Sequence, residues 1–148
     1  MAKTIELEMV TPERVALRGS ADFVVLPALE GEMGILPGHE PFWVELKAGE
    51  LRVSQGEEVR RFAIAGGFAE IARDRASVFA ETAEMAEEID AEAARQELEK
   101  ARTETARKDI DPLTLAAAEA AIRLAAVKLR VAELRGRRGR QGPPPQVR

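Results

Sequence analysis

The sequence predicts a β + α protein in which an N-terminal antiparallel β-sandwich is followed by a C-terminal antiparallel two-helix hairpin. Up to about residue 81, short stretches of alternating apolar and polar residues recur, with turn residues roughly every eight to twelve positions. After Ile89 the apolar residues step by three and four, as on one face of a helix. A chain of 148 residues is long enough for one well-cored domain with an appendage. We therefore expect a sandwich over 1–85, a helical hairpin over 86–135 and a disordered basic Pro/Gly tail over 136–148.

Strands are expected where apolar residues alternate with polar ones. In the first stretch Ile5, Leu7 and Met9 alternate with Glu6 and Glu8, so one strand face is predicted to be buried and the other wet. The stretches that read in this way are TIELEMV (4–10), DFVVLP (22–27), PFWVEL (41–46), ELRVS (50–54), RRFAIA (60–65), GFAEIA (67–72) and ASVFA (76–80).

Two amphipathic helices are expected after the strands. In the KDIDPL link between them, Asp111 is placed to cap the second helix while Pro112 occupies its first turn, where a missing N–H costs nothing. That helix runs from Pro112 to about Arg135 and is roughly 35 Å long at 1.5 Å per residue. Its alanine-rich seam removes little apolar area from water. The hairpin is therefore either a weakly docked unit suited to movement or a permanently docked completion of the fold.

Composition excludes several functions. The chain has no cysteine and a net charge of −4, with four arginines gathered after residue 135, so thiol chemistry is excluded and nucleic acid is a poor partner. No apolar run resembles a signal or membrane-spanning segment. His39 and Glu40 begin like a zinc-binding HExxH motif, but Trp43 stands where the second histidine belongs. Neither a serine nucleophile elbow nor a phosphate-binding loop is found, so we expect a non-catalytic binding or coupling module without a metal.

The segment GEMGILPGHEP (31–41) resembles the GxxGxxPGHxP segment of the epsilon subunit of bacterial F-type ATP synthases, the subunit called delta in mitochondria. Further segments follow in the family's order and spacing, so the resemblance extends to about Arg135. These segments are VTPER near the start, LKAGELRV (46–53), AIAGGFAEI (63–71), VFAETAEMAEEID (78–90) and a closing helix that ends LRVAEL. The resemblance implies a β-sandwich followed by a helical hairpin, in agreement with the periodicities.

The resemblance also implies partners for the sandwich. In this family the sandwich binds the gamma subunit at the foot of the central stalk and rests on the ring of c subunits. By resemblance, Glu32 is the candidate partner for a basic residue of the c-subunit polar loops. His39 lies at the same face, or else the segment only sets a tight turn with His39 bonded to backbone. The implied c-ring-facing loop comprises Gly31, Glu32, Gly34, Pro37, Gly38 and His39.

A regulatory role is implied for the hairpin. In the family it lies folded beside the sandwich or extends along gamma into the catalytic alpha/beta head, where it opposes ATP hydrolysis. The candidate contacts lie in two stripes. Arg123 and Arg130 are seven residues apart on one face, and Lys128, Arg135 and Arg138 form or continue another. The alternative is ordinary solvated charge on an amphipathic helix.

Members of the family that bind ATP carry an I/L-D-x-x-R-A motif at the start of the first hairpin helix. This chain has Ile89 and Asp90, but Ala93 replaces the arginine ahead of Ala94. Arg95 is two residues further on, about 200° round a helix, and is no obvious substitute. Asp90 is more simply an N-cap. We therefore expect no cofactor and weak or no ATP binding.

The sequence thus predicts a non-catalytic rotor subunit that couples gamma to the c-ring during proton-driven ATP synthesis. Such a subunit is peripheral to the cytoplasmic face of the bacterial inner membrane through its complex. The alternative is a free-standing β-sandwich and hairpin adaptor for another partner.

Overall fold

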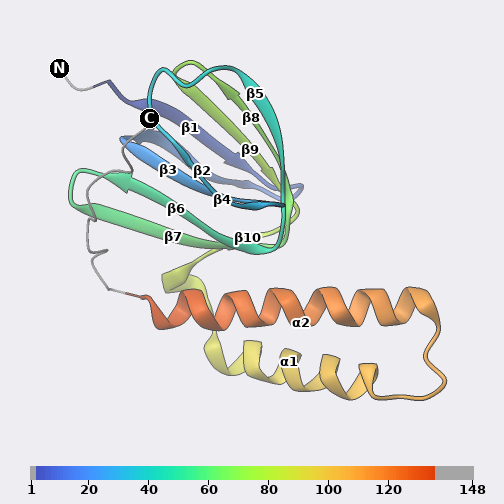
Figure 1. Cartoon of the computed structure of the whole chain (residues 1–148). Coiled ribbons are helices and arrows are strands. Elements are labelled where there is room, and N and C mark those ends of the chain that lie inside the picture. The colour runs from blue at the N-terminus through green and yellow to red at the C-terminus, as the bar shows by residue number, and fades with distance from the viewer. Residues whose placement is uncertain (1–2, 136–148) are drawn as a thin grey trace.

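The computed structural model describes residues 3–135, in which ten strands precede a short 3-10 turn and two helices (Figure 1). The elements are β1 (Ile5–Val10), β2 (Val15–Ala21), β3 (Phe23–Ala28), β4 (Gly31–Ile35), β5 (Phe42–Leu46), β6 (Gly49–Gln55), β7 (Glu58–Ile64), β8 (Gly67–Ala72), β9 (Arg75–Ala80), β10 (Ala83–Met85), η1 (Ala86–Glu88), α1 (Ala91–Thr105) and α2 (Pro112–Glu133). The predicted order of a β-sandwich followed by a helical hairpin is confirmed.

The strands follow the order β10-β7-β6-β3-β5-β8-β9-β1-β2, with β4 paired to β3. Strands β3 and β5 share one pairing, between Ala28 and Leu46, and there the sheet folds over into two layers. Side chains from both layers fill the core because alternate residues of each strand point inward. Its largest fully buried members include Ile5, Leu7, Met9, Leu26, Leu51, Phe62 and Ile71.

One pair of strands departs from the predicted antiparallel arrangement. Strand β1 lies between β2, to which it is antiparallel, and β9, to which it is parallel with Leu7 opposite Ala76. Parallel pairing needs a long connection between the two strands, and here the other strands of the sandwich supply it. The sheet is therefore mixed, and the chain reaches β9 only after most of the sandwich has been laid down.

Three strands lie where none was expected. Strand β2 has mostly exposed and half-exposed residues and contains Gly19, so its alternation is weak. Strand β10 has only three residues. Strand β4 corrects the expectation that the segment from Gly31 is a loop, because residues 31–35 pair with β3 along their whole length. The strand was not recognised in the sequence because two of its five residues are glycines, which add nothing to an apolar and polar alternation.

The two helices are capped as expected. The Asp90 side chain accepts a hydrogen bond from the Ala93 N–H, and the Asp111 side chain accepts one from the Thr114 N–H. The hydrogen bond from the Thr114 hydroxyl to the Asp111 carboxylate also lowers the pKa of Asp111. Helices α1 and α2 pack side by side through buried alanines at positions 94, 101, 118 and 125.

The hairpin is folded against the sandwich, and α2 is the helix that contacts strands β6 and β7 (Figure 1). The contact is a small apolar cluster separate from the main core. It consists of Ala63, Ala86, Ile89 and Val131, with Val127 and Ala132 packed against it.

Candidate interaction surfaces

Glu32 does not lie in a loop. It lies on β4 opposite Pro27, where its two carboxylate oxygens accept hydrogen bonds from Nη1 and Nη2 of Arg52, both at 3.1 Å. The hydrogen bond from Arg52 lowers the pKa of Glu32, although partial burial opposes the shift. The carboxylate is thus held in its ionised form, and with its side chain 56% exposed it still reaches solvent.

The Glu32 and Arg52 pair belongs to a larger charged network on the outer side of β6 and β7. Arg52 also contacts Glu50 at 2.8 Å, and Arg61 reaches the same Glu50 oxygen at 3.1 Å. The Glu50 and Arg61 side chains are only 10% and 13% exposed. Because buried charges need partners, this arrangement fixes the orientation of Arg52 and through it that of Glu32.

His39 lies apart from Glu32, in the loop between β4 and β5. Its Nδ1 is 3.0 Å from the Glu40 carbonyl oxygen and its ring centroid is 4.8 Å from that of Phe42. The preceding Gly38 has φ +82° and donates its N–H toward Asp74 and the Arg73 carbonyl. The predicted c-ring-facing set is therefore split. Gly31, Glu32 and Gly34 belong to β4, whereas Pro37, Gly38 and His39 belong to a loop tied to the β8–β9 turn.

The four predicted regulatory cations lie in different surroundings. Lys128 and Arg135 contact the rest of the protein, Lys128 through Glu84 and Glu97 and Arg135 through backbone carbonyls. Arg130 is exposed, and its charge contributes to the lowered pKa of Glu32. Arg123 is exposed and has no hydrogen-bond or ion-pair partner within residues 3–135. In the folded hairpin, Lys128 and Arg135 thus have hydrogen-bond or ion-pair partners, whereas Arg123 and Arg130 are exposed without them within residues 3–135.

A row of exposed aromatic side chains was missed by the sequence analysis. Trp43, Phe68 and Phe79 project from adjacent strands β5, β8 and β9 and are 66%, 42% and 39% exposed. Their rings stack in order, with centroids 5.6 Å apart for Trp43 and Phe68 and 4.8 Å for Phe68 and Phe79. Alternation was the signal that could have found them, because each takes an outward position. They lie on the layer opposite the hairpin.

Acidic residues border this aromatic row. Glu45 lies opposite Phe68 and Glu70 lies opposite Trp43 in the paired strands. An open hollow beside the row is lined by Trp43, Phe68 and Glu81, among others. Contiguous exposed apolar groups of this kind mark binding surfaces, and the carboxylates favour a partner with basic residues.

The degraded nucleotide motif supplies no cation. Asp90 is used as the α1 N-cap, at 3.1 Å from the Ala93 nitrogen, and Ala94 is buried in the seam between the helices. Arg95 pairs with Glu92 at 3.1 Å on the exposed side of α1.

No group of three or more His, Asp or Glu side chains within residues 3–135 is arranged to hold a metal ion. In the same range, neither helix combines the length and the hydropathy needed to cross a bilayer.

The fold defines a class of two-part proteins in which a helical hairpin docks on one layer of a β-sandwich. The family model described as the ATP synthase delta/epsilon chain β-sandwich domain matches residues 4–86. The ATP synthase epsilon chain of Syntrophobacter fumaroxidans is 46% identical over 136 residues, covering 90% of this chain and 98% of that one. That of Dehalococcoides mccartyi is 43% identical, covering 91% and 96%. The chain therefore belongs to the ATP synthase delta/epsilon chain family.

Solved structures agree with this assignment. A chain in the cryo-EM structure of the Euglena gracilis mitochondrial ATP synthase, which contains OSCP, F1 and the c-ring, matches with a TM-score of 0.76 and 28% identity. The match covers 88% of this chain and 81% of that one. A chain of the central stalk and c-ring of the Tetrahymena thermophila enzyme shares the fold, with a TM-score of 0.56 at 14% identity.

Proposed function

We propose that this chain is a non-catalytic rotor subunit of an F-type ATP synthase that couples the gamma subunit to the c-ring during proton-driven synthesis. In this role it is peripheral to the cytoplasmic face of the bacterial inner membrane, held there by its complex. Its hairpin opposes ATP hydrolysis when it leaves the sandwich and reaches the catalytic alpha/beta head. The family membership and the resemblance of the GEMGILPGHEP segment support this role.

The observation that carries the binding role is the row of Trp43, Phe68 and Phe79. Three stacked, exposed aromatic rings on the outer side of a sheet are costly to leave in water. The bordering carboxylates surround the row with negative charge, so the row suits a partner surface that is apolar and basic. We assign this face to gamma and the exposed carboxylate of Glu32 to the c-ring.

The hairpin supports the regulatory part of the proposal. Its contact with the sandwich is a small cluster of mostly alanine and valine side chains, which stabilises the folded position only modestly. Helices α1 and α2 hold each other through their own alanine seam, so they are able to move as one unit.

The test measures ATP hydrolysis by the reconstituted alpha, beta and gamma complex, alone and with two forms of this chain. One form is full length and the other ends at Asp90, which removes both helices. We expect full-length chain to suppress hydrolysis and the truncated chain to bind gamma without suppressing it. Co-purification with gamma checks binding for each form.

Two results contradict the proposal in different ways. If neither form co-purifies with gamma, the assignment to the rotor is wrong and an adaptor for another partner replaces it. If both bind and neither changes the rate, the chain is a coupler without a regulatory hairpin.

A further inference from the structure

The polar contacts between the hairpin and the sandwich are concentrated in one short segment. Residues 83–89, which comprise β10, η1 and Ile89, form the last strand of the sandwich and lead from it to α1. This junction segment packs against α2 through Ala86 and Ile89. Any departure of the hairpin from the sandwich must break the contacts that α2 makes with the junction segment and with β7.

Arg135, just beyond the end of α2, donates hydrogen bonds to the backbone of the junction segment. Its Nε donates to the Ala86 carbonyl oxygen at 3.0 Å and its Nη2 donates to the Ile89 carbonyl oxygen at 2.6 Å. Ala86 is the first residue of η1 and Ile89 follows its last residue, so one guanidinium spans the 3-10 turn. Hydrogen bonds with an ionised donor are shorter and stronger than neutral ones.

Lys128, on α2 two turns before Arg135, contacts both β10 and α1. Its Nζ lies 3.1 Å from a Glu84 carboxylate oxygen on β10 and 3.6 Å from one of Glu97 on α1. The lysine side chain is only 15% exposed, so water screens these pairs less than it screens a surface ion pair.

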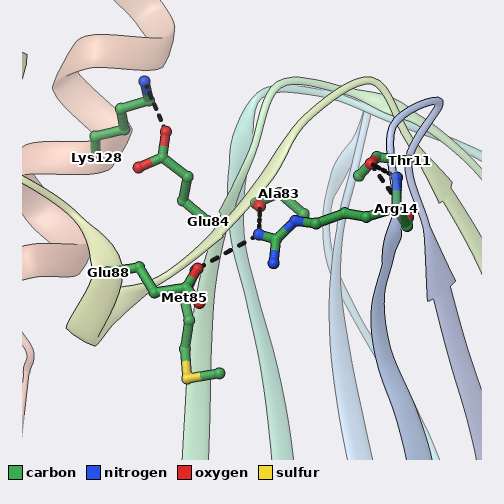
Figure 2. A network of polar contacts seen from close by, with 7 residues as sticks. All are labelled: Thr11, Arg14, Ala83, Glu84, Met85, Glu88 and Lys128. Atoms are coloured by element: carbon green, nitrogen blue, oxygen red, sulfur yellow. Dashed lines mark hydrogen bonds and ion pairs between the residues drawn. The ribbon is translucent and has the colours of Figure 1, made fainter.

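Arg14 holds the same segment from the sandwich side (Figure 2). From the β1–β2 turn, its Nη2 donates to the Ala83 carbonyl oxygen at 2.9 Å and lies 3.4 Å from the Glu88 carboxylate. Thr11 in turn accepts a hydrogen bond from the Arg14 N–H at 3.2 Å. The junction segment is thereby fixed to the sandwich, so the hairpin leaves by breaking the contacts that α2 and Arg135 make with this segment and with β6 and β7.

We infer that Lys128 and Arg135 form a latch that holds the hairpin on the junction segment and sets how often it opens. The latch is a property of the isolated chain, whereas its importance for hydrolysis rests on the proposed function. These two cations serve in the folded position, so they are not available to another surface until the hairpin has been released.

Hydrogen exchange on the full-length chain tests the latch directly. We expect Lys128→Ala and Arg135→Ala each to speed exchange of the amides of residues 86–89, which the docked hairpin covers, by about tenfold, since each removes charged hydrogen bonds. Alanine has a higher helix propensity than lysine, and Arg135 lies beyond the end of α2, so faster exchange in these variants does not come from a weaker helix.

Two matched controls are available on the hairpin. Lys100 and Arg107 are exposed, and among the described residues neither contacts the sandwich or the junction segment. Lys100→Ala and Arg107→Ala remove the same charges and should leave exchange of residues 86–89 unchanged. Amides of β1 and β9 report whether the sandwich remains folded in every variant.

A double-mutant cycle between Lys128 and Glu84 separates the latch from general destabilisation. We expect Lys128→Ala and Glu84→Ala to be less than additive in opening the hairpin, because each breaks the same pair. Added salt should weaken the Lys128 contribution more than that of Arg135, whose acceptors are carbonyls.

The inference is overturned if the Lys128 and Arg135 variants exchange at the rates of their controls, or if the cycle is additive. This outcome is independent of the hydrolysis assay. A chain with a working latch that fails to suppress hydrolysis contradicts the proposed function alone.

Discussion

At Glu32 hydrogen bonding and burial act in opposite directions on one carboxyl group. The hydrogen bond from Arg52 lowers its pKa, partial burial raises it, and the net shift is downward from 4.5. A carboxyl with a lowered pKa in the folded state stabilises the fold above its unfolded pKa. That contribution is lost as the pH falls through the lowered pKa.

We expect Glu32→Gln to reduce the free energy of unfolding at pH 7 by about 0.5 kcal/mol, since the side chain is 56% exposed and solvent screens the pair. The difference from the unmodified chain should shrink at acid pH, as the pH falls through the lowered pKa of Glu32. Urea unfolding at pH 7 and at acid pH measures it. Glu57→Gln, on the exposed β6–β7 turn, is the control and should show no such difference. An equal loss at both pH values would contradict the assignment to ionisation.

Gly67 is fixed by the backbone beside it. Its φ is +140°, and an added Cβ would overlap the carbonyl oxygen of Phe79 on the neighbouring strand. We expect Gly67→Ala to lower the free energy of unfolding by about 2–4 kcal/mol through backbone strain and displacement of β9. Gly19→Ala is the control, because no atom lies within 4 Å of a Cβ added there. Thermal unfolding of the two variants measures the contrast.

Among the elements, the hairpin depends on close approach of its two helices. Ala118 is 3% exposed in the seam, whereas Ala120 on the same helix is exposed. We expect Ala118→Leu to push α1 away from α2 and to destabilise the hairpin by about 1–3 kcal/mol, as overpacking does. Ala120→Leu should be nearly neutral. Hydrogen exchange of α1 amides distinguishes them, and equal exchange in both variants would show that the seam tolerates larger side chains.

The elements also show what the sequence can reveal. Strands with strict alternation and helices with Asp caps were predictable because the signal is local, as at Ile5 to Met9 and at Asp111. Strand β4 was not, because its glycines add no pattern and its pairing with β3 is set by the sandwich. The parallel register of β1 with β9 depends on contacts about 70 residues apart, which alternation does not encode.

For the candidate surfaces too, local features could be predicted from the sequence and long-range contacts could not. The cations of α2 were identifiable from their type and spacing, but their roles were not. Whether Lys128 or Arg123 contacts a partner inside the chain depends on which face of α2 packs against the sandwich. The docked face is the one that carries Val131, which is fully buried, and Lys128 reaches Glu84 from there. The aromatic row was overlooked because its three members come from separate strands and meet only when β5, β8 and β9 pair.

For the whole molecule, the two layers of the sandwich carry different surfaces. The aromatic row lies on the layer of β5, β8 and β9, while the hairpin lies against β6 and β7 of the other layer. A partner bound to the aromatic row therefore leaves the hairpin contact uncovered. In the proposed function, this separation would allow the chain to stay attached to the rotor while its hairpin changes position.

We expect Trp43→Ser to weaken binding to isolated gamma by about tenfold or more, because truncating a large aromatic anchor at an interface typically costs over 1 kcal/mol. Leu113→Ser is the control. That leucine is also exposed, at 84%, but it lies at the start of α2 away from the row. Titration of gamma with each variant measures the effect. Equal affinities for the two variants would place the gamma contact elsewhere.

The parallel pairing of β1 with β9 also governs the order in which the chain folds. Strand β1 completes its pairing only when residues 75–79 are available, so the sandwich closes late during synthesis. The hairpin needs contacts only within about 45 residues and forms quickly once its helices leave the ribosome. Its docking site on β7 and the junction segment is then already in place. We therefore expect the hairpin to fold and dock after the sandwich has closed.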